Sequence, residues 1–447
     1  MYTKTFIALL ISICFASCMP EGSQQKMPQT SSEISGISTV KLSRIDSLVS
    51  QYVSENKFPG GVFLVARRGK IVYYKNLGNR SLDTGKPYQK DDIFRIASMT
   101  KAVTAVAAMQ LYEQGRLGLD DPVSKYIPAF DKAHVLDKFN PRDSAYTSFP
   151  AGGKITIRHL LTHTSGLGYG KSQAGDLFAA YAKLGFHGGS GLSHPYWTTE
   201  ELANRIARLP LAFHPGDRYL YGLNMDVLGR VIEVVSGMTL SDYFEQNIFT
   251  PLGMSDTHFY LPEDKYDRLV PVHDYVEDQM VMYRENDELK VSRDYPEFKN
   301  ARAYFGGGGL SSTTLDYAKF LQSLLSTTKG RENYADADNL IQNDHHLLGH
   351  KTLALMVSDQ FVRLNALSKG MNRKVGVSHG LGVALTTATG TDPKSPGSYE
   401  WGGSFSSKFF VDPEEELIFV GMSQAIPRYH QEFYGRVTAI IYGAIND

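Results

Sequence analysis

Two pairs of strand-forming segments lie at opposite ends of this 447-residue chain. Near the start, VFLVA (62–66) and IVYYK (71–75) flank the polar turn RRGK, which predicts a β-hairpin. Near the end, SKFFV (407–411) and LIFVGMS (417–423) flank a second polar turn in the same way. Because the segment between these hairpins has mostly helical patterns, we expect an α+β fold in which both ends of the chain close one antiparallel sheet.

Helical patterns define the rest of the expected architecture. Apolar residues at helical spacing predict one helix near 42–53 and another near 433–441. We expect helices to flank the sheet in an α/β lobe made of 41–120 and 365–447. Residues 121–364 should form a mostly helical second lobe.

The composition is that of an ordinary globular protein, with 42% hydrophobic residues, 21% charged residues and a formal net charge of −1. This balance gives no reason to expect a nucleic-acid partner. The two cysteines are Cys14 and Cys18, so residues 19–447 offer no disulfide, thiol nucleophile or cysteine-bound metal.

Residues 1–18 have the pattern of a targeting segment. Lys4 precedes the apolar run Phe6–Phe15, which is too short to cross a bilayer but fits a signal peptide. The following Ala-Ser-Cys is similar to the lipidation signal of bacterial lipoproteins, and simple cleavage nearby is the alternative. We expect an exported protein of the bacterial cell envelope, with a membrane anchor on Cys18 and facing the periplasm or the cell surface. Residues 19–40, rich in Ser, Gln, Pro and Thr, are expected to form a flexible linker.

The pattern Ser-x-x-Lys can place a nucleophile beside its base, and it occurs five times, starting at Ser23, Ser38, Ser54, Ser98 and Ser326. The first two lie in the expected linker, and the serines at 54 and 326 lie near the ends of expected helices. Ser98 differs because the segment after it has no charged residue between Lys101 and Glu113. A helix that is apolar nearly all round should be buried.

Burial of this helix would let Ser98 and Lys101 act as a nucleophile and its base. Residues three apart share a helical face, so the lysine amine should lie beside the hydroxyl. A dehydrated amine next to a hydroxyl is a base next to a nucleophile, and free N–H groups at the start of the helix can hold an oxyanion. The structural alternative is that Ser98 caps the helix while Lys101 reaches outward to solvent.

Five stretches, in order, resemble the serine β-lactamase and penicillin-binding-protein family, and more distinctly the class C-related family-VIII carboxylesterases. They are IFRIASMTKAVTAVAAMQL (93–111), IRHLLTHTSGL (157–167), HPGDRYLYGLNMDVLGRVIEVVSG (214–237), GGGGLSSTTLDYAKFLQSLL (306–325) and YEWGGSFSSKFFVDPEEELIFVGMSQ (399–424). The resemblance spans nearly all of 41–447. It implies a β-lactamase/DD-peptidase-like fold and an acyl-enzyme formed on a serine.

The resemblance also implies residue roles. Ser98 matches the family's nucleophile, and Lys101 and Tyr221 match the residues that take and return its proton. Tyr219 is the rival for the tyrosine role, but Tyr-x-Leu-x-x-Asp-Val-Leu-Gly, beginning at Tyr221, resembles the esterase pattern without a gap. The N–H groups of Ser98 and Ser404 would then form the oxyanion hole.

Two departures from lactamases affect the expected substrate. Leu223 stands where lactamases carry an asparagine. Trp401, Gly402 and Gly403 match the Lys-Thr-Gly motif and are the expected substrate-binding residues. In the family the cation of that motif helps to hold the substrate's carboxylate, whereas a tryptophan offers an apolar face and one N–H donor. We therefore expect a carboxylesterase acting on neutral acyl substrates, with no metal or organic cofactor.

Two other functions stay open at this point. A β-lactamase or D-Ala-D-Ala carboxypeptidase uses the same nucleophile, and a non-catalytic envelope lipoprotein could keep the fold as a binding module. In every case the expected ligand is a small molecule, an ester or amide in the case of an enzyme.

Other motifs compete weakly with this interpretation. Gly-x-Ser-x-Gly around Ser378 fits an α/β-hydrolase elbow, but the polar residues before it indicate a loop entering a strand. His159 and His163 are four apart and could share a metal, yet no third ligand is evident. Gly306–Gly309 lack the lysine of a phosphate loop and are expected to pack near the site instead.

Overall fold

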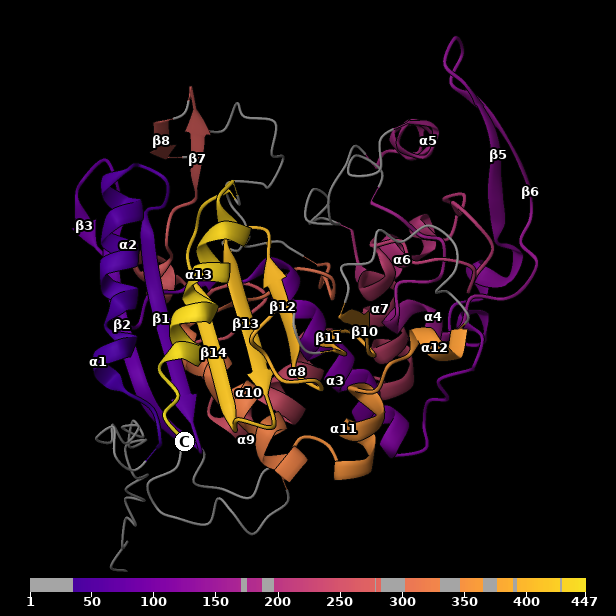
Figure 1. The fold of residues 1–447 in the computed structure, drawn as a ribbon. Coiled ribbons are helices and arrows are strands. Elements are labelled where there is room, and N and C mark those ends of the chain that lie inside the picture. Colours follow the sequence, from indigo (N-terminus) through magenta and orange to yellow (C-terminus); the bar gives the residue numbers. More distant parts are fainter. Residues whose placement is uncertain are drawn as a thin grey trace, which may run out of the picture.

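The computed structural model describes residues 35–169, 175–186, 197–277, 279–282, 302–329, 346–364, 376–388, 392–426 and 428–447 (Figure 1). The predicted signal segment, Cys18 and residues 19–34 of the linker lie outside these residues. The described ranges contain no helix that could serve as a membrane span.

The main sheet joins the two ends of the chain, as the sequence predicted. It has eight strands in the order β10-β11-β12-β13-β14-β1-β2-β3, and β1 pairs antiparallel with β14, with Val65 opposite Phe419. The strands are β1 (Gly60–Arg67), β2 (Lys70–Ser81), β3 (Lys86–Pro87), β10 (Val377–His379), β11 (Ala384–Thr386), β12 (Tyr399–Gly403), β13 (Ser407–Asp412) and β14 (Leu417–Met422).

Both faces of this sheet are covered, so β1 is buried along its whole length. Phe63 and Val65 pack in a cluster with α2 (Arg44–Ser54) and α13 (His430–Gly443). Val62 and Leu64 point to the opposite face, where the core includes α3 (Thr100–Glu113) and α10 (Thr314–Lys329). The alternation follows from the two-residue period of a strand. The fold is therefore α+β, as expected.

The central helix α3 is buried nearly all round, as its missing charges predicted. It packs against α7 (Asn224–Ser236). The other helices are α1 (Thr39–Leu42), α4 (Ile157–Leu161), α5 (Asp176–Lys183), α6 (Thr199–Ile206), α8 (Leu240–Phe244), α9 (Thr250–Leu252), α11 (His350–Met356) and α12 (Phe361–Leu364).

Some features of the architecture were not foreseen. Helix α10 falls within the segment assigned to the helical lobe, yet it packs against β1 and β14. A hairpin of β5 (His134–Asn140) and β6 (Ala145–Pro150) extends away from the body (Figure 1). Its side chains are mostly exposed, so it lacks the alternating apolar pattern that reveals a strand in sequence. The other strands pair as β4 (Phe94–Arg95) with β9 (Ser311–Ser312) and β7 (His273–Val276) with β8 (Gln279–Met282).

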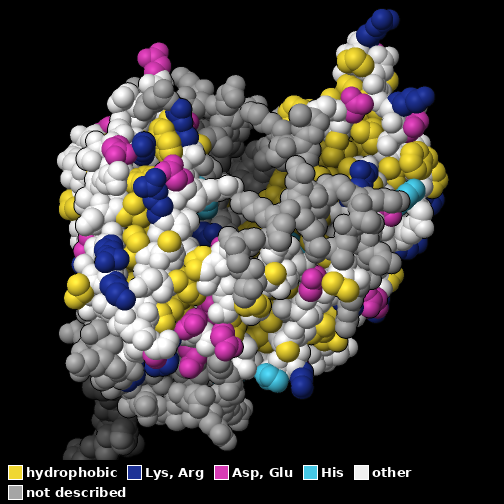
Figure 2. All heavy atoms as spheres, viewed as in Figure 1, with side chains coloured by type: hydrophobic (Ala, Val, Ile, Leu, Met, Phe, Trp, Pro, Cys, Tyr) yellow, Lys and Arg dark blue, Asp and Glu magenta, His cyan; other side chains and the backbone are white. Residues whose placement is uncertain are grey.

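The face seen in Figure 2 carries positive and negative side chains interspersed, with a hollow between the sheet side at left and the helical side at right. Among the described atoms on this face, side chains of one charge sign do not gather into a single patch.

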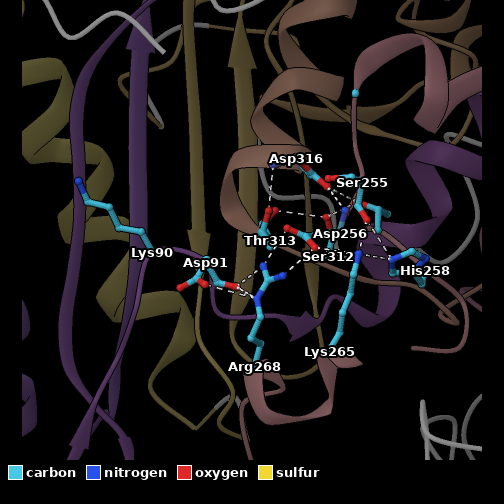
Figure 3. A network of polar contacts seen from close by, with 12 residues as sticks. Lys90, Asp91, Ser255, Asp256, His258, Lys265, Arg268, Ser312, Thr313 and Asp316 are labelled. Carbon is cyan, nitrogen blue, oxygen red and sulfur yellow. Dashed lines mark hydrogen bonds and ion pairs between the residues drawn. The ribbon is translucent and has the colours of Figure 1, made fainter. Parts of the chain in front are cut away.

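A polar network fastens the segment after α9 to the sheet lobe (Figure 3). Both carboxylate oxygens of Asp256 accept hydrogen bonds from Arg268, each at 2.8 Å, and Lys265 approaches to 3.0 Å. The Asp256 N–H donates to Asp316 on α10 at 2.8 Å. Asp256 is therefore held both by its charged partners and by its backbone hydrogen bond to helix α10.

This network predicts a dependence of stability on pH. Burial alone would raise the pKa of Asp256, but hydrogen bonds from Arg268 and Lys265 lower it to about 2. Its stabilisation is therefore complete above about pH 4 and is lost as the pH falls toward 2, with a magnitude of about 2 kcal/mol. In urea unfolding, Asp256→Asn should cost that amount at pH 6 and much less at pH 2. Equal losses at the two pH values would contradict the assignment.

Candidate active site

Ser98 lies in a short 3₁₀ turn (η1, Ala97–Met99) that leads into α3. Ala97 has a φ of +44°, in the left-handed region that residues with a Cβ rarely adopt. The turn is held by a hydrogen bond from Ile96 N–H to Leu310 O at 3.0 Å and by the Tyr317 hydroxyl on Met99 O at 2.9 Å. The residue that caps α3 is Met99, so Ser98 is not the helix cap that the structural alternative required.

Lys101 is fully buried beside Ser98. Its Nζ donates to Ser98 Oγ at 3.2 Å and to Gly307 O. The Nζ also lies 4.8 Å from the ring centre of Tyr221 and 5.6 Å from that of Tyr169. The alternative in which this lysine reaches solvent is therefore wrong, and the glycines at 306–309 do pack near the site.

The structure separates the two candidate tyrosines. Tyr221 lies against Lys101 and 5.3 Å from the ring of Tyr169, with which it shares a side-chain hydrogen bond. Tyr219 instead packs against His379 at 5.5 Å. Tyr169 was not predicted, and burial, together with Tyr221 and other neighbours, raises its pKa well above the ordinary value.

Strand β12 brings the remaining predicted residues toward the serine turn. A Cβ on Gly403 would lie 2.4 Å from Ile96 O and 2.2 Å from Ser407 Oγ, so only glycine permits this approach. At Gly402 a Cβ would lie 3.1 Å from Ser407 O, a tight contact, and 3.5 Å from His430 Nε2, so position 402 is crowded as well, though less than position 403. Ser404 follows directly after the strand and is exposed.

Trp401 is half-buried and belongs to an aromatic group that sequence reasoning missed. Its ring lies 5.7 Å from Tyr221, 5.3 Å from His379 and 6.3 Å from His163. Burial lowers the pKa of His163 well below the ordinary value and that of His379 to about 4, so both rings are neutral near pH 7. The histidine rings that pack on Trp401 are therefore uncharged near pH 7.

His163 is oriented by a second layer of polar contacts. Ser165 donates to Asn224 Oδ1 at 2.5 Å, which leaves the Asn224 amide N–H to donate to His163 Nδ1 at 3.0 Å. His159 points elsewhere, since its Nδ1 accepts from Thr156 N–H in the cap of α4. The two histidines do not converge, and the described residues contain no group of three or more His, Cys, Asp or Glu that could hold a metal.

The competing serines have structural contacts. Ser378 lies on β10, donates to Asp359 at 2.6 Å and is followed by β11, so it is not a nucleophile elbow. Ser38 caps α1, Ser54 ends α2, and Ser326 accepts a hydrogen bond from Gln322 within α10. Ser23 lies outside the described residues.

Comparison with known proteins agrees with this geometry. The family model described as Beta-lactamase matches residues 45–435. Lovastatin esterase of Penicillium rubens is 31% identical over 86% of this chain and 92% of its own. Esterase EstB of Burkholderia gladioli is 30% identical over 83% of this chain and 86% of its own.

A solved structure extends the likeness to the fold. EstCE1, described as a hydrolase with promiscuous acyltransferase activity, superposes with a TM-score of 0.73 and 26% identity, covering 92% of this chain and 99% of its own. The predicted resemblance to the family-VIII esterases is confirmed. The chain belongs to the Beta-lactamase family, within its group of serine hydrolases and acyl transferases.

Proposed function

We propose that this protein is a carboxylesterase that forms an acyl-enzyme on Ser98 with neutral acyl substrates. Ser98 Oγ attacks the ester carbonyl, and its proton passes to the Lys101–Tyr221 pair, which returns a proton to the leaving alcohol. Water then attacks the acyl-enzyme and releases the acid. The N–H groups of Ser98 and Ser404 hold the oxyanion, and each such donor is typically worth about 2.7–4 kcal/mol of barrier.

The observation that carries this proposal is the set of uncharged aromatic rings that pack on Trp401. Its aromatic neighbours are Tyr221 and two buried histidines that are neutral near pH 7. A substrate carboxylate would lose its hydration there without gaining an ion pair. A neutral acyl chain would instead bury apolar surface against the rings.

The proposal predicts selectivity for esters over β-lactams. Turnover of p-nitrophenyl butyrate should exceed that of nitrocefin in kcat/KM by at least about 100-fold. Trp401→Lys should narrow this gap by restoring a cation, and Trp401→Phe is the matched control that keeps an aromatic ring. Faster turnover of nitrocefin than of the ester would favour a β-lactamase or carboxypeptidase, and failure to react with either would favour a binding lipoprotein.

Acyl transfer is the second candidate, favoured by the similarity to EstCE1. The same acyl-enzyme would pass its acyl group to an alcohol instead of water. Adding butanol to the ester assay and measuring butyl ester by gas chromatography separates the two outcomes.

We also propose that the protein is exported and anchored in the cell envelope through Cys18. The support is the apolar run Phe6–Phe15 and the small residues before Cys18. Incorporation of labelled palmitate that persists in Cys18→Ala would exclude this anchor.

A further inference from the structure

Asp226 is a buried carboxylate next to the site that the mechanism above does not use. It lies in the first turn of α7 and is fully buried. Its Oδ1 accepts from Gly307 N–H at 3.1 Å, while Oδ2 has no hydrogen-bond partner within the described part of the chain. Buried carboxylates need a compensating partner, so the contacts of Asp226 call for an explanation.

Gly307 connects Asp226 to the catalytic lysine. Its N–H donates to Asp226, and its carbonyl accepts from Lys101 Nζ. A Cβ at position 307 would lie 2.6 Å from Asp226 Oδ2, so only glycine lets the loop sit between the two side chains. One residue of the Gly306–Gly309 loop thus touches both the amine and the carboxylate.

Lys101 is the charged group that acts on Asp226. Burial raises the pKa of Asp226 to about 6, and Lys101 together with the Gly307 N–H opposes the rise. Asp226 in turn acts on Tyr169, which lies in the loop after α4. The negative charge of Asp226 helps to raise the pKa of that tyrosine. The helices α6 and α8, which pack on α7, also carry carboxylates. Glu200 of α6 pairs with Arg230, and Asp242 of α8 accepts a hydrogen bond from Thr239, so both have partners other than Asp226.

We propose that Asp226 is a positioning residue for the Ser98–Lys101 pair, holding the lysine amine beside the hydroxyl through Gly307 and through its negative charge. This inference rests on the proposed acyl-enzyme mechanism. The inference predicts that activity is lost at acidic pH. Protonation of the Asp226 carboxylate removes the negative charge that faces Lys101. Activity should therefore fall as the pH drops through the region of pH 6.

Asp226→Asn tests the charge alone, because the amide oxygen can still accept from Gly307 N–H. We expect kcat/KM for p-nitrophenyl butyrate to fall by on the order of 10- to 100-fold at pH 7.5. The fall in activity near pH 6 should also disappear from the pH profile. Glu233→Gln is the matched control, since Glu233 is also on α7, its pKa is also raised by burial, and its carboxyl bonds Leu240 N–H and Arg230 away from the site.

Two outcomes would overturn the proposal. One is an Asp226→Asn protein whose activity still falls at acidic pH with the same midpoint as in the wild type. The other is a wild-type rate of fluorophosphonate labelling at Ser98 that does not change between pH 5 and 7, a measurement that needs no variant to fold. Because this probe reports the nucleophile whatever the substrate, rapid labelling without ester turnover would count against the proposed esterase function alone.

Discussion

Replacing Ser98 by alanine is expected to abolish ester turnover, with a loss of at least about 10⁴-fold in kcat. The reason is that the Oγ beside the buried Lys101 is the proposed site of the covalent bond, and no other group on this turn can replace it. The fold should persist, because Ser98 is not the cap of α3 and its neighbours Ala97 and Met99 fill the core.

The chain offers a matched control for this variant. Ser326 begins the same Ser-x-x-Lys pattern but lies in α10, where its hydroxyl accepts from Gln322 at 3.2 Å. Ser326→Ala should therefore keep full activity. Residual turnover of Ser98→Ala above about 1% of the wild type, in protein shown to be folded by circular dichroism, would place the nucleophile elsewhere.

Replacing Lys101 by methionine should change both activity and stability. Loss of the amine removes one member of the Lys101–Tyr221 pair that carries the proton, together with the hydrogen bond to Ser98. General acid–base groups of this kind contribute about 10²–10⁴-fold. The change also leaves the Asp226 carboxylate without its counter-charge. The two side chains form no direct ion pair and are linked through Gly307 and through space. The loss of stability should therefore be smaller than the roughly 3–5 kcal/mol for breaking a direct buried pair.

A double variant separates these two effects. Adding Asp226→Asn to Lys101→Met removes the uncompensated charge, so urea unfolding should recover most of the lost stability while activity stays low. Additive losses of stability in the double variant would show that the two side chains do not interact.

Features governed by local pattern were predictable from the sequence. The two hairpins at the ends of the chain, the buried helix after Ser98 and the last helix all have apolar residues at a clear period. Ser98, Lys101, Trp401 and Tyr221 were selected by motif, and the structure places Lys101 and Tyr221 beside the serine turn.

Features governed by distant contacts were not predictable. Lys101 and Gly307 are 206 positions apart, and nothing local to either residue indicates that a backbone carbonyl receives the amine. Asp226 was part of a recognised motif, but its burial depends on how α7 packs against α3. Similarly, the stronger need for glycine at 403 than at 402 depends on which face of β12 meets Ile96.

The central claim is that Ser98 is acylated by a neutral ester and not by a penicillin. Intact-protein mass spectrometry after exposure to p-nitrophenyl butyrate, and separately to penicillin G, tests it directly beside the Ser98→Ala control. We predict a butyryl adduct that forms and turns over in the wild type, no adduct in the control, and no penicillin adduct in either. A stable penicillin adduct on Ser98 would contradict the argument from Trp401 and move the protein to the peptidoglycan-directed side of its family.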